Sequence, residues 1–209
     1  MGDDEKCAIA CKVVLIGESG VGKTSIISRY IHNQFSAVLM STTGASFATK
    51  TIYLEEQKQS IKFEISDTAG QERYRSLAKI FYQSAAVAVL VYDVSKKKSF
   101  ESLDAWLQEL RQHNEGNLPV FLVGNKNDLN KAVTPEEGMN FSKVNNIIYF
   151  TECSAKTGYK IKDIFFEAAK YLYKTYKQFQ SQNKLPTSSK LKIGANDNQA
   201  FEGRKKKCC

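Results

Sequence analysis

A glycine-rich segment near the N-terminus has the residue types and spacing of a phosphate-binding loop. Residues 17–24 have the sequence GESGVGKT, which fits the pattern G-x-x-x-x-G-K-T. Glycines allow successive backbone N–H groups to point inward, and a following helix N-terminus adds partial positive charge. We expect Lys23 to reach the β- and γ-phosphates of a nucleoside triphosphate and the hydroxyl of Thr24 to bind Mg²⁺. The alternative is a chance glycine-rich turn. The predicted phosphate site comprises Ser19, Gly20, Val21, Gly22, Lys23, Thr24 and Ser25.

Two later motifs predict which base is bound. Residues 125–128 (NKND) follow an apolar run at 120–123, and Asp128 can accept hydrogen bonds from N1–H and the 2-amino group of guanine. Adenine has neither donor, so the wrong base would leave this carboxylate unpaired. The second motif is residues 154–156 (SAK), which follow the apolar run at 147–150. Either motif alone is usually an ordinary loop, but together and in this order they predict a guanine nucleotide, GTP or GDP. The bracing and base-contacting residues are expected to be Asn125, Lys126, Ser154, Ala155 (through its N–H) and Lys156.

The elements that must position these loops alternate between strands and helices. Continuous apolar runs typical of buried parallel strands lie at 12–16, 87–92, 120–123 and 147–150. Residues 47–54 and 61–67 are expected to form a hairpin, the second strand with clean alternation. This order predicts an α/β fold with a largely parallel sheet and right-handed crossovers.

Helices are expected between these strands. Thr134, Pro135 and Glu137 form a typical helix start, with a hydroxyl cap, a proline in the first turn and a glutamate at the third position. Apolar residues recur at helical spacing in three other segments: Ile26, Ile27, Tyr30 and Ile31; Phe100, Leu103, Leu107 and Leu110; and Ile161, Ile164, Phe165, Ala168 and Leu172.

Length and composition limit the class of protein. The chain has 209 residues, 42% hydrophobic and 25% charged, as expected for one globular domain with a tail, and unlike a collagen, a coiled coil or a disordered chain. The net charge is +8, of which residues 184–209 carry +5 (seven Lys/Arg, two Asp/Glu). A basic tail on a nearly neutral body argues against a nucleic-acid-binding domain. Five scattered cysteines and the absence of a signal-peptide pattern favour a reducing, cytosolic setting.

Taken together, these motifs resemble the Rab family of the Ras superfamily of small GTPases over residues 11–176. Residues 67–72 (DTAGQE) are similar to the second switch of these proteins, and residues 41–47 (STTGASF) to the first. Residues 71–77, 81–85 and 90–95 resemble further Rab signatures, and GASF at 44–47 leans toward the early-endosomal subgroup. The resemblance implies a P-loop GTPase fold: a six-stranded, mostly parallel sheet with one antiparallel strand and helices on both faces.

The resemblance also implies roles for single residues. Thr42 would bind Mg²⁺ through its hydroxyl and the γ-phosphate through its N–H, and Asp67 would hold Mg²⁺ through a water. The Gly70 N–H would contact the γ-phosphate, and Gln71 would orient the attacking water as the catalytic residue. Phe35 would pack against guanine. The implied metal site is therefore Thr24, Thr42 and Asp67. Hydrolysis would be slow unless an activating protein assists, and loss of the γ-phosphate would release both switches.

The C-terminus, residues 204–209 (RKKKCC), resembles the end of Rab proteins that receive two geranylgeranyl groups, on Cys208 and Cys209. Two lipid chains with a polybasic patch anchor a protein stably to an anionic membrane. The alternatives are a soluble basic tail and an exposed metal-binding pair. The expected organisation is an N-terminal extension at 1–10, a GTP-binding domain at 11–180 and a flexible tail at 181–209.

Several positions depart from the family: Thr43 replaces the usual Ile, Gln83 and Ser84 replace Arg and Gly, and the most informative departure is at Ser66. Ser66 stands where Rabs usually carry Trp, directly before DTAG. Alternation with Lys62 and Glu64 predicts an outward side chain, so we expect Phe47, Ser66 and Phe81 to form an altered surface for effectors.

The predicted function is a membrane-anchored GTPase that cycles between GTP and GDP to regulate vesicle traffic, on the cytoplasmic face of the early endosome with a cytosolic pool. The expected partners are an exchange factor, a GTPase-activating protein, a GDP-dissociation inhibitor, a prenylation escort protein and effectors; we expect a monomer and no nucleic acid. The alternatives are a constitutively GTP-bound scaffold that does not cycle and a basic nucleic-acid-binding protein.

Overall fold

The sheet at the centre of the molecule confirms the predicted α/β architecture. The structure, a computed structural model, describes residues 8–37, 46–67, 82, 85–114 and 118–183. Within them six strands form one sheet in the order β2-β3-β1-β4-β5-β6, with β2 antiparallel to β3 and the other pairs parallel. The strands are β1 (Ile9–Ile16), β2 (Ser46–Leu54), β3 (Gln59–Asp67), β4 (Val87–Asp93), β5 (Val120–Asn125) and β6 (Tyr149–Glu152).

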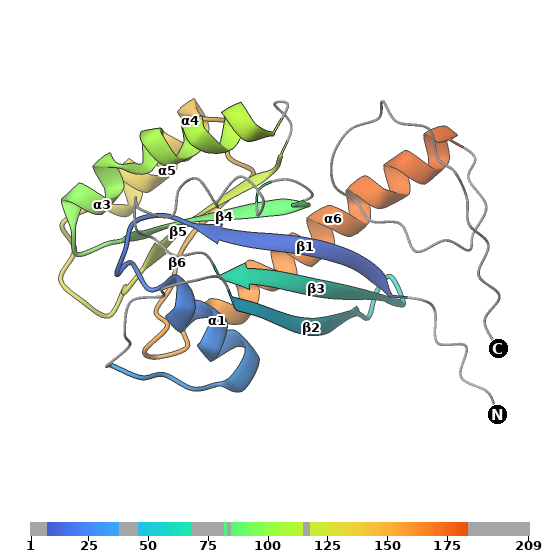
Figure 1. The fold of residues 1–209 in the computed structure, drawn as a ribbon, viewed down its shortest axis with the longest axis horizontal. Coiled ribbons are helices and arrows are strands. Elements are labelled where there is room, and N and C mark those ends of the chain that lie inside the picture. The colour runs from blue at the N-terminus through green and yellow to red at the C-terminus, as the bar shows by residue number, and fades with distance from the viewer. Residues whose placement is uncertain (1–7, 38–45, 68–81, 83–84, 115–117, 184–209) are drawn as a thin grey trace.

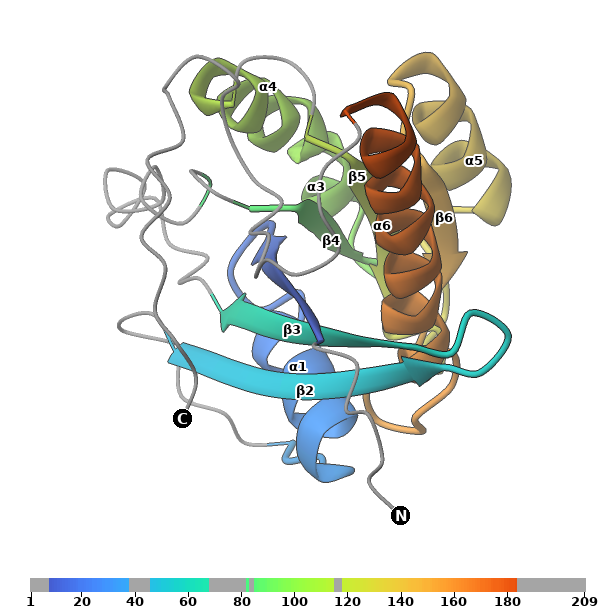
Figure 2. The same cartoon turned by 90° about the vertical axis from the view of Figure 1, so that its right-hand side faces the viewer.

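Helices cover both faces of this sheet (Figures 1 and 2). The helices are α1 (Lys23–His32), α3 (Lys97–Glu101), α4 (Leu103–His113), α5 (Pro135–Val144) and α6 (Ile161–Asn183). Buried side chains of α1 and α6 share one apolar cluster with Val13 and Leu15 of β1. Their neighbours Val14 and Ile16 belong to a second cluster, with buried side chains of α4. Alternate residues of β1 therefore serve two cores, as expected of a central strand with helices on both sides.

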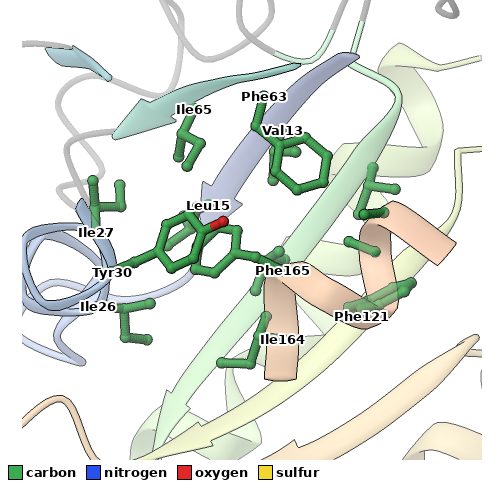
Figure 3. Packing of buried hydrophobic residues seen from close by; sticks show 14 of the residues in the cluster. Val13, Leu15, Ile26, Ile27, Tyr30, Phe63, Ile65, Phe121, Ile164 and Phe165 are labelled. Atoms are coloured by element: carbon green, nitrogen blue, oxygen red, sulfur yellow. The ribbon is translucent and has the colours of Figure 1, made fainter. Parts of the chain in front are cut away.

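The helix that follows the glycine-rich loop is fixed by aromatic stacking. Tyr30 of α1 and Phe165 of α6 lie with ring centroids 3.8 Å apart and planes 13° from parallel, as Figure 3 shows. Ile26, Phe63 and Ile65 surround this pair in the same cluster. This packing holds α1 against the sheet and keeps the N-terminal end of α1 close to the C-terminal end of β1 (Figure 1).

The α5 start has the predicted capping box. The Glu137 N–H donates to the Thr134 hydroxyl (3.3 Å), and the Thr134 N–H donates to the Glu137 carboxylate (2.9 Å). These bonds satisfy backbone donors that have no partner in a helix end. Among the described residues, no helix combines the length and the apolar character that crossing a bilayer requires.

Two local predictions were wrong. The last strand begins at Tyr149, two positions after the predicted start at residue 147, because pairing with β5 sets its register from Phe121 opposite Tyr149. Ser66 is fully buried rather than outward-facing. It lies opposite Val14 of β1, whose second half is buried on both faces, so alternation no longer predicts exposure there. Its hydroxyl is buried without a hydrogen-bond partner in the described part of the chain.

Candidate nucleotide-binding site

The glycine-rich loop connects β1 to α1 and depends on two glycines. Gly17 has φ of 137°, and a Cβ at this position would lie 2.2 Å from the Val91 carbonyl oxygen. Gly22 has φ of 97°, and a Cβ there would lie 2.3 Å from the Asn125 amide nitrogen. Only glycine fits both the backbone conformation and the close approach. The loop is therefore pressed against the ends of β4 and β5.

Lys23 is buried at the first position of α1, with 5% of its surface exposed. Its ammonium donates to the carbonyl oxygens of Gly17 (2.8 Å) and Glu18 (2.9 Å). Burial lowers the pKa of Lys23 to about 8, although the charges of Asp67 and Glu18 oppose this shift. The loop thus holds a desolvated cation at a helix N-terminus, which is an environment suited to an anion.

Thr24 and Asp67 meet beside this cation, although they are 43 positions apart. The Thr24 hydroxyl donates to Asp67 Oδ2 at 2.6 Å. Asp67 ends β3 and is almost fully buried, and burial raises its pKa despite the Thr24 hydrogen bond and the nearby Lys23 charge. Its second oxygen, Oδ1, is buried and has no hydrogen-bond partner among the described residues. A hydroxyl and a carboxylate with an open oxygen are ligands that fit Mg²⁺.

Asn125 joins the glycine-rich loop to the 154–156 loop. Its buried amide nitrogen donates to the Val21 carbonyl at 2.9 Å, and its Oδ1 accepts the Ala155 N–H at 3.1 Å. The Cys153 thiol lies 3.6 Å from the same oxygen. The Ala155 N–H, which we expected to meet a base carbonyl, is therefore already bonded to Asn125.

Lys126 has a buried carboxylate as a partner. Its ammonium donates to the Gly20 carbonyl at 2.8 Å and lies 2.6 Å from Asp93 Oδ2. Asp93 is almost fully buried and also accepts from the N–H (3.0 Å) and hydroxyl (2.6 Å) of Ser95. Burial opposes ionisation of Asp93, but the hydrogen bonds from Lys126 and Ser95 outweigh it and lower its pKa.

Sequence reasoning missed Asp93. The available signal was an aspartate at the end of an apolar strand, beside the strand that carries Asn125. Such an aspartate is common, and only the sheet order shows that it faces Lys126.

Asp128 is oriented by the loop that follows β6. Ser154 donates from its hydroxyl to Asp128 Oδ1 at 2.6 Å, and the Thr157 N–H donates to the same hydroxyl at 3.1 Å. Lys156 Nζ lies 3.7 Å from Asp128 Oδ2. The structure therefore brings residues 125–128 and 154–156 together with the glycine-rich loop, at the carboxyl ends of β1, β5 and β6.

The remaining predicted site residues are only partly described. Ser19 is exposed, Ser25 is half-buried, and Phe35 and Phe47 are 37% and 68% exposed. The exposure of Phe47 fits a surface residue, while its cross-strand neighbour Ser66 is buried. The other predicted residues lie outside the described part of the chain: Thr42, Gly70, Gln71, Phe81, Cys208 and Cys209.

Two cysteines of the described chain are buried, and Cys153 also contacts Asn125 Oδ1 of this site through its thiol. Cys11 and Cys153 are buried free thiols. Burial raises the pKa of Cys11 to about 12 and also raises that of Cys153, so both stay protonated and unreactive. Cys7 lies outside the described residues.

The fold and this site define a P-loop nucleotide-binding protein of the α/β class. Comparison with known proteins extends this result. Residues 12–174 match the Ras family. The chain is 39% identical over 205 residues to the Ras-related protein RABA1g of Arabidopsis thaliana, covering 95% of this chain and 93% of the relative. It is 42% identical over 167 residues to Ras-related protein RABF2b of the same plant (79% and 82%) and 41% identical over 173 residues to Ras-related protein Rab11D of Lotus japonicus (82% and 78%).

The chain therefore belongs to the Ras family, as a Rab small GTPase, and it is a GTP hydrolase.

Proposed function

We propose that this GTPase is a membrane-anchored switch that cycles between GTP- and GDP-bound states to regulate vesicle traffic, at endosomal membranes. The observation that supports it best is the Thr24–Asp67 pair. Asp67 is the last residue of β3 and lies next to the phosphate loop, with one buried oxygen open to a cation. In the sequence, Asp67 is the first residue of the segment that resembles the second switch. A cation held by Asp67 would therefore be linked directly to the backbone of that segment.

Residues of this chain account for the phosphate chemistry. Lys23 and the N–H groups of the loop would hold the β- and γ-phosphates and offset negative charge that develops in phosphoryl transfer. Thr24, Asp67 and Thr42 would hold Mg²⁺, which would supply further positive charge to the phosphates. Gln71 would orient the attacking water. The Thr24 hydroxyl can hold the cation through a lone pair of its oxygen while its hydrogen is still donated to Asp67.

Base selection would depend on Asp128, with its carboxylate held by Ser154. The base carbonyl would share the Ala155 N–H with Asn125, and Phe35 would cover a face of the ring. The test is Asp128→Asn, because an amide can donate to the 2-oxo group of xanthine, whereas the carboxylate accepts from the 2-amino group of guanine. We expect the variant to bind xanthosine diphosphate better than GDP. The exposed Asp104→Asn on α4 is the matched control and should prefer GDP. A GDP preference unchanged in Asp128→Asn would refute this base site.

Cycling separates the switch from a scaffold that stays loaded with GTP. Single-turnover hydrolysis of bound GTP should be slow, should accelerate with a GTPase-activating protein, and should lose that acceleration in Gln71→Leu. An exchange factor, a GDP-dissociation inhibitor, a prenylation escort protein and effectors are the other partners expected of such a switch. A chain that retained GTP with and without an activating protein would be the scaffold instead.

Membrane anchoring is proposed to depend on Cys208 and Cys209. The tagged full-length chain should lie on endosomal membranes with a cytosolic pool, and the variant with both cysteines changed to serine should be diffuse. Cys11→Ser, a change at a buried thiol, is the control for cysteine substitution as such. Another membrane would exclude the endosomal assignment, and membrane binding by the double serine variant would exclude lipid anchoring.

A further inference from the structure

A single arginine side chain on α1 contacts three backbone carbonyls from two separate loops. Arg29 donates from Nε to the Ala155 carbonyl (2.8 Å) and from Nη2 to the Lys156 carbonyl (2.7 Å). Its Nη1 donates to the Asn33 carbonyl at 2.8 Å and to the Asn33 side-chain oxygen at 3.4 Å. All these acceptors are neutral oxygens, so the planar guanidinium acts here as a rigid set of donors rather than as half of an ion pair.

The Arg29 contacts fix the backbone that faces the predicted base. A peptide unit is planar and its carbonyl and N–H point in opposite directions in the trans form. Holding the Ala155 carbonyl on Arg29 therefore turns the N–H of Lys156, in the same peptide unit, away from α1. On the other side of the same residue, the Ala155 N–H is held by Asn125 at 3.1 Å. Two side chains from distant elements thus set the direction of successive peptide units in the 154–156 loop.

The third contact of Arg29 is to a different segment, at the C-terminal end of α1. Asn33 ends α1 in a left-handed conformation (φ 55°), and its N–H donates to the Arg29 carbonyl at 3.0 Å. Two residues later comes Phe35, which we expect to cover the base. Because one guanidinium binds Asn33 and the 154–156 loop, the spacing between these two segments is set by the width of a single planar group.

Helix α1 gives Arg29 a fixed base. The adjacent residue, Tyr30, stacks on Phe165 at 3.8 Å, and its carbonyl accepts from Lys50 of β2 at 2.6 Å. Figure 3 shows Tyr30 and Phe165 facing one another between α1 and α6. Arg29 therefore extends from a helix turn that cannot rotate freely, which is what a positioning side chain requires.

We propose that Arg29 is a positioning residue for guanine recognition: its contacts with Asn33, Ala155 and Lys156 hold the two segments that enclose the base and aim the N–H groups of the 154–156 loop at the base carbonyl. This inference rests on the base site proposed above. Arg29 acts through the backbone and does not itself touch the nucleotide.

The experiment measures release of GDP carrying a fluorescent label on its ribose, chased with excess unlabelled GDP. Arg29→Gln removes the fork of donors, and we expect release about 10- to 100-fold faster, as for loss of one or two charge-assisted hydrogen bonds. Arg29→Lys retains the charge but cannot span both loops, so its rate should fall between those of the wild type and Arg29→Gln. Arg111→Gln is the matched control, because Arg111 also donates to one backbone carbonyl (Asn145, 2.7 Å), on α4 away from this site. Its rate should stay within about twofold of wild type.

A second ligand separates positioning of the base from general stability. In 6-thio-GDP a sulfur, a weak acceptor, replaces the base carbonyl that the loop N–H groups would bind. The wild type should release 6-thio-GDP faster than GDP, and this ratio should shrink toward one in Arg29→Gln. The fold-change caused by Arg29→Gln should also be the same with Mg²⁺ and with EDTA, since it acts on the base and not on the phosphates.

Three results would overturn the inference. These are a release rate in Arg29→Gln within twofold of wild type, an unchanged ratio between the two ligands, or an effect that disappears in EDTA. Thermal unfolding of each variant with saturating GDP confirms that it is folded, and Arg29→Lys serves if Arg29→Gln does not fold. The Asp128→Asn experiment tests the base site separately from Arg29. If Asp128→Asn prefers xanthosine diphosphate but Arg29→Gln has no effect on release, the base site stands and only the role of Arg29 is refuted.

Discussion

The ion pair between Lys126 and Asp93 leads to the sharpest prediction, for the substitution Asp93→Asn. The ammonium lies 2.6 Å from a carboxylate that is almost fully buried and that also accepts twice from Ser95. Asparagine keeps the shape and one oxygen for Ser95 but removes the negative charge. Lys126 would then hold the Gly20 carbonyl without its charged partner.

The magnitude follows from the burial of the two partners. Removing one partner of a buried ion pair costs about 3–5 kcal/mol when the other charge is left buried. The Lys126 side chain is 30% exposed, so water can solvate part of its charge, and the amide retains a hydrogen bond; we therefore expect about 2 kcal/mol. We assign half of this free-energy loss to folding and half to nucleotide binding, which gives about 1 kcal/mol for each. That corresponds to roughly fivefold faster GDP release and to a Tm lower by about 2–4 °C.

The assay is a double-mutant cycle on GDP release. Lys126→Met removes the ammonium, and Asp93→Asn in that background should change the release rate less than twofold, because its partner is gone. Asp163→Asn, at an exposed position in the first turn of α6, is the control for a lost carboxylate; it should leave release unchanged and lower Tm by less than Asp93→Asn does. If the effect of Asp93→Asn is as large in Lys126→Met as in wild type, the pair does not carry the effect and the reasoning is wrong.

Four further predictions concern the glycine-rich loop, Lys23 and Ser66. Gly17→Ala should abolish nucleotide binding or folding, because its Cβ would lie 2.2 Å from the Val91 carbonyl oxygen. Gly20→Ala would meet nothing within 4 Å and should cost only about 1 kcal/mol, for its φ of 77°. Equal losses of stability for the two variants in chemical denaturation would contradict this. Burial lowers the pKa of Lys23 from 10.5 to about 8 in the nucleotide-free protein. Between these pH values the unfolded state binds more protons than the folded state. The stability of the nucleotide-free protein should therefore rise with pH from about 8 to 10.5. Phosphates favour the charged lysine, so GDP binding should take up a fraction of a proton at pH 9 and almost none at pH 7; calorimetry in buffers of different ionisation enthalpy measures this, and equal uptake at both pH values would refute it. Ser66→Ala should leave unfolding free energy unchanged or raise it by up to about 1 kcal/mol, because it removes a buried hydroxyl that lacks a partner in the described chain; a loss above 1 kcal/mol in urea would show that this hydroxyl is bonded.

The parts of this molecule that local sequence determines were predictable. The glycine-rich loop, the capping box at Thr134 and the apolar strands β4 and β5 each follow from a short run of residues and the backbone geometry it favours. The family resemblance extended these predictions to the strand count and the one antiparallel pair, which the sheet confirms.

The rest depends on contacts between distant segments, which spacing along the chain does not show. Alternation from Ile61 to Ile65 predicts that Ser66 faces outward, yet the neighbouring end of β1 is covered on both sides. Asp93 finds its partner at the end of the neighbouring strand β5, and Arg29 finds one that is 126 positions away along the chain. Such partners become visible only when the order of the strands and the packing of α1 are known.

The stack of Tyr30 on Phe165 has a consequence for how a partner protein can tell the two nucleotide states apart. It joins α1, which begins at the phosphate loop, to α6, the helix from which the C-terminal tail departs. The helix that starts at the phosphate loop and the last helix of the domain are therefore packed as one unit. Under the function proposed above, an anchor that follows α6 would not depend on the bound nucleotide. A partner that binds only one nucleotide state would then recognise a different part of the surface.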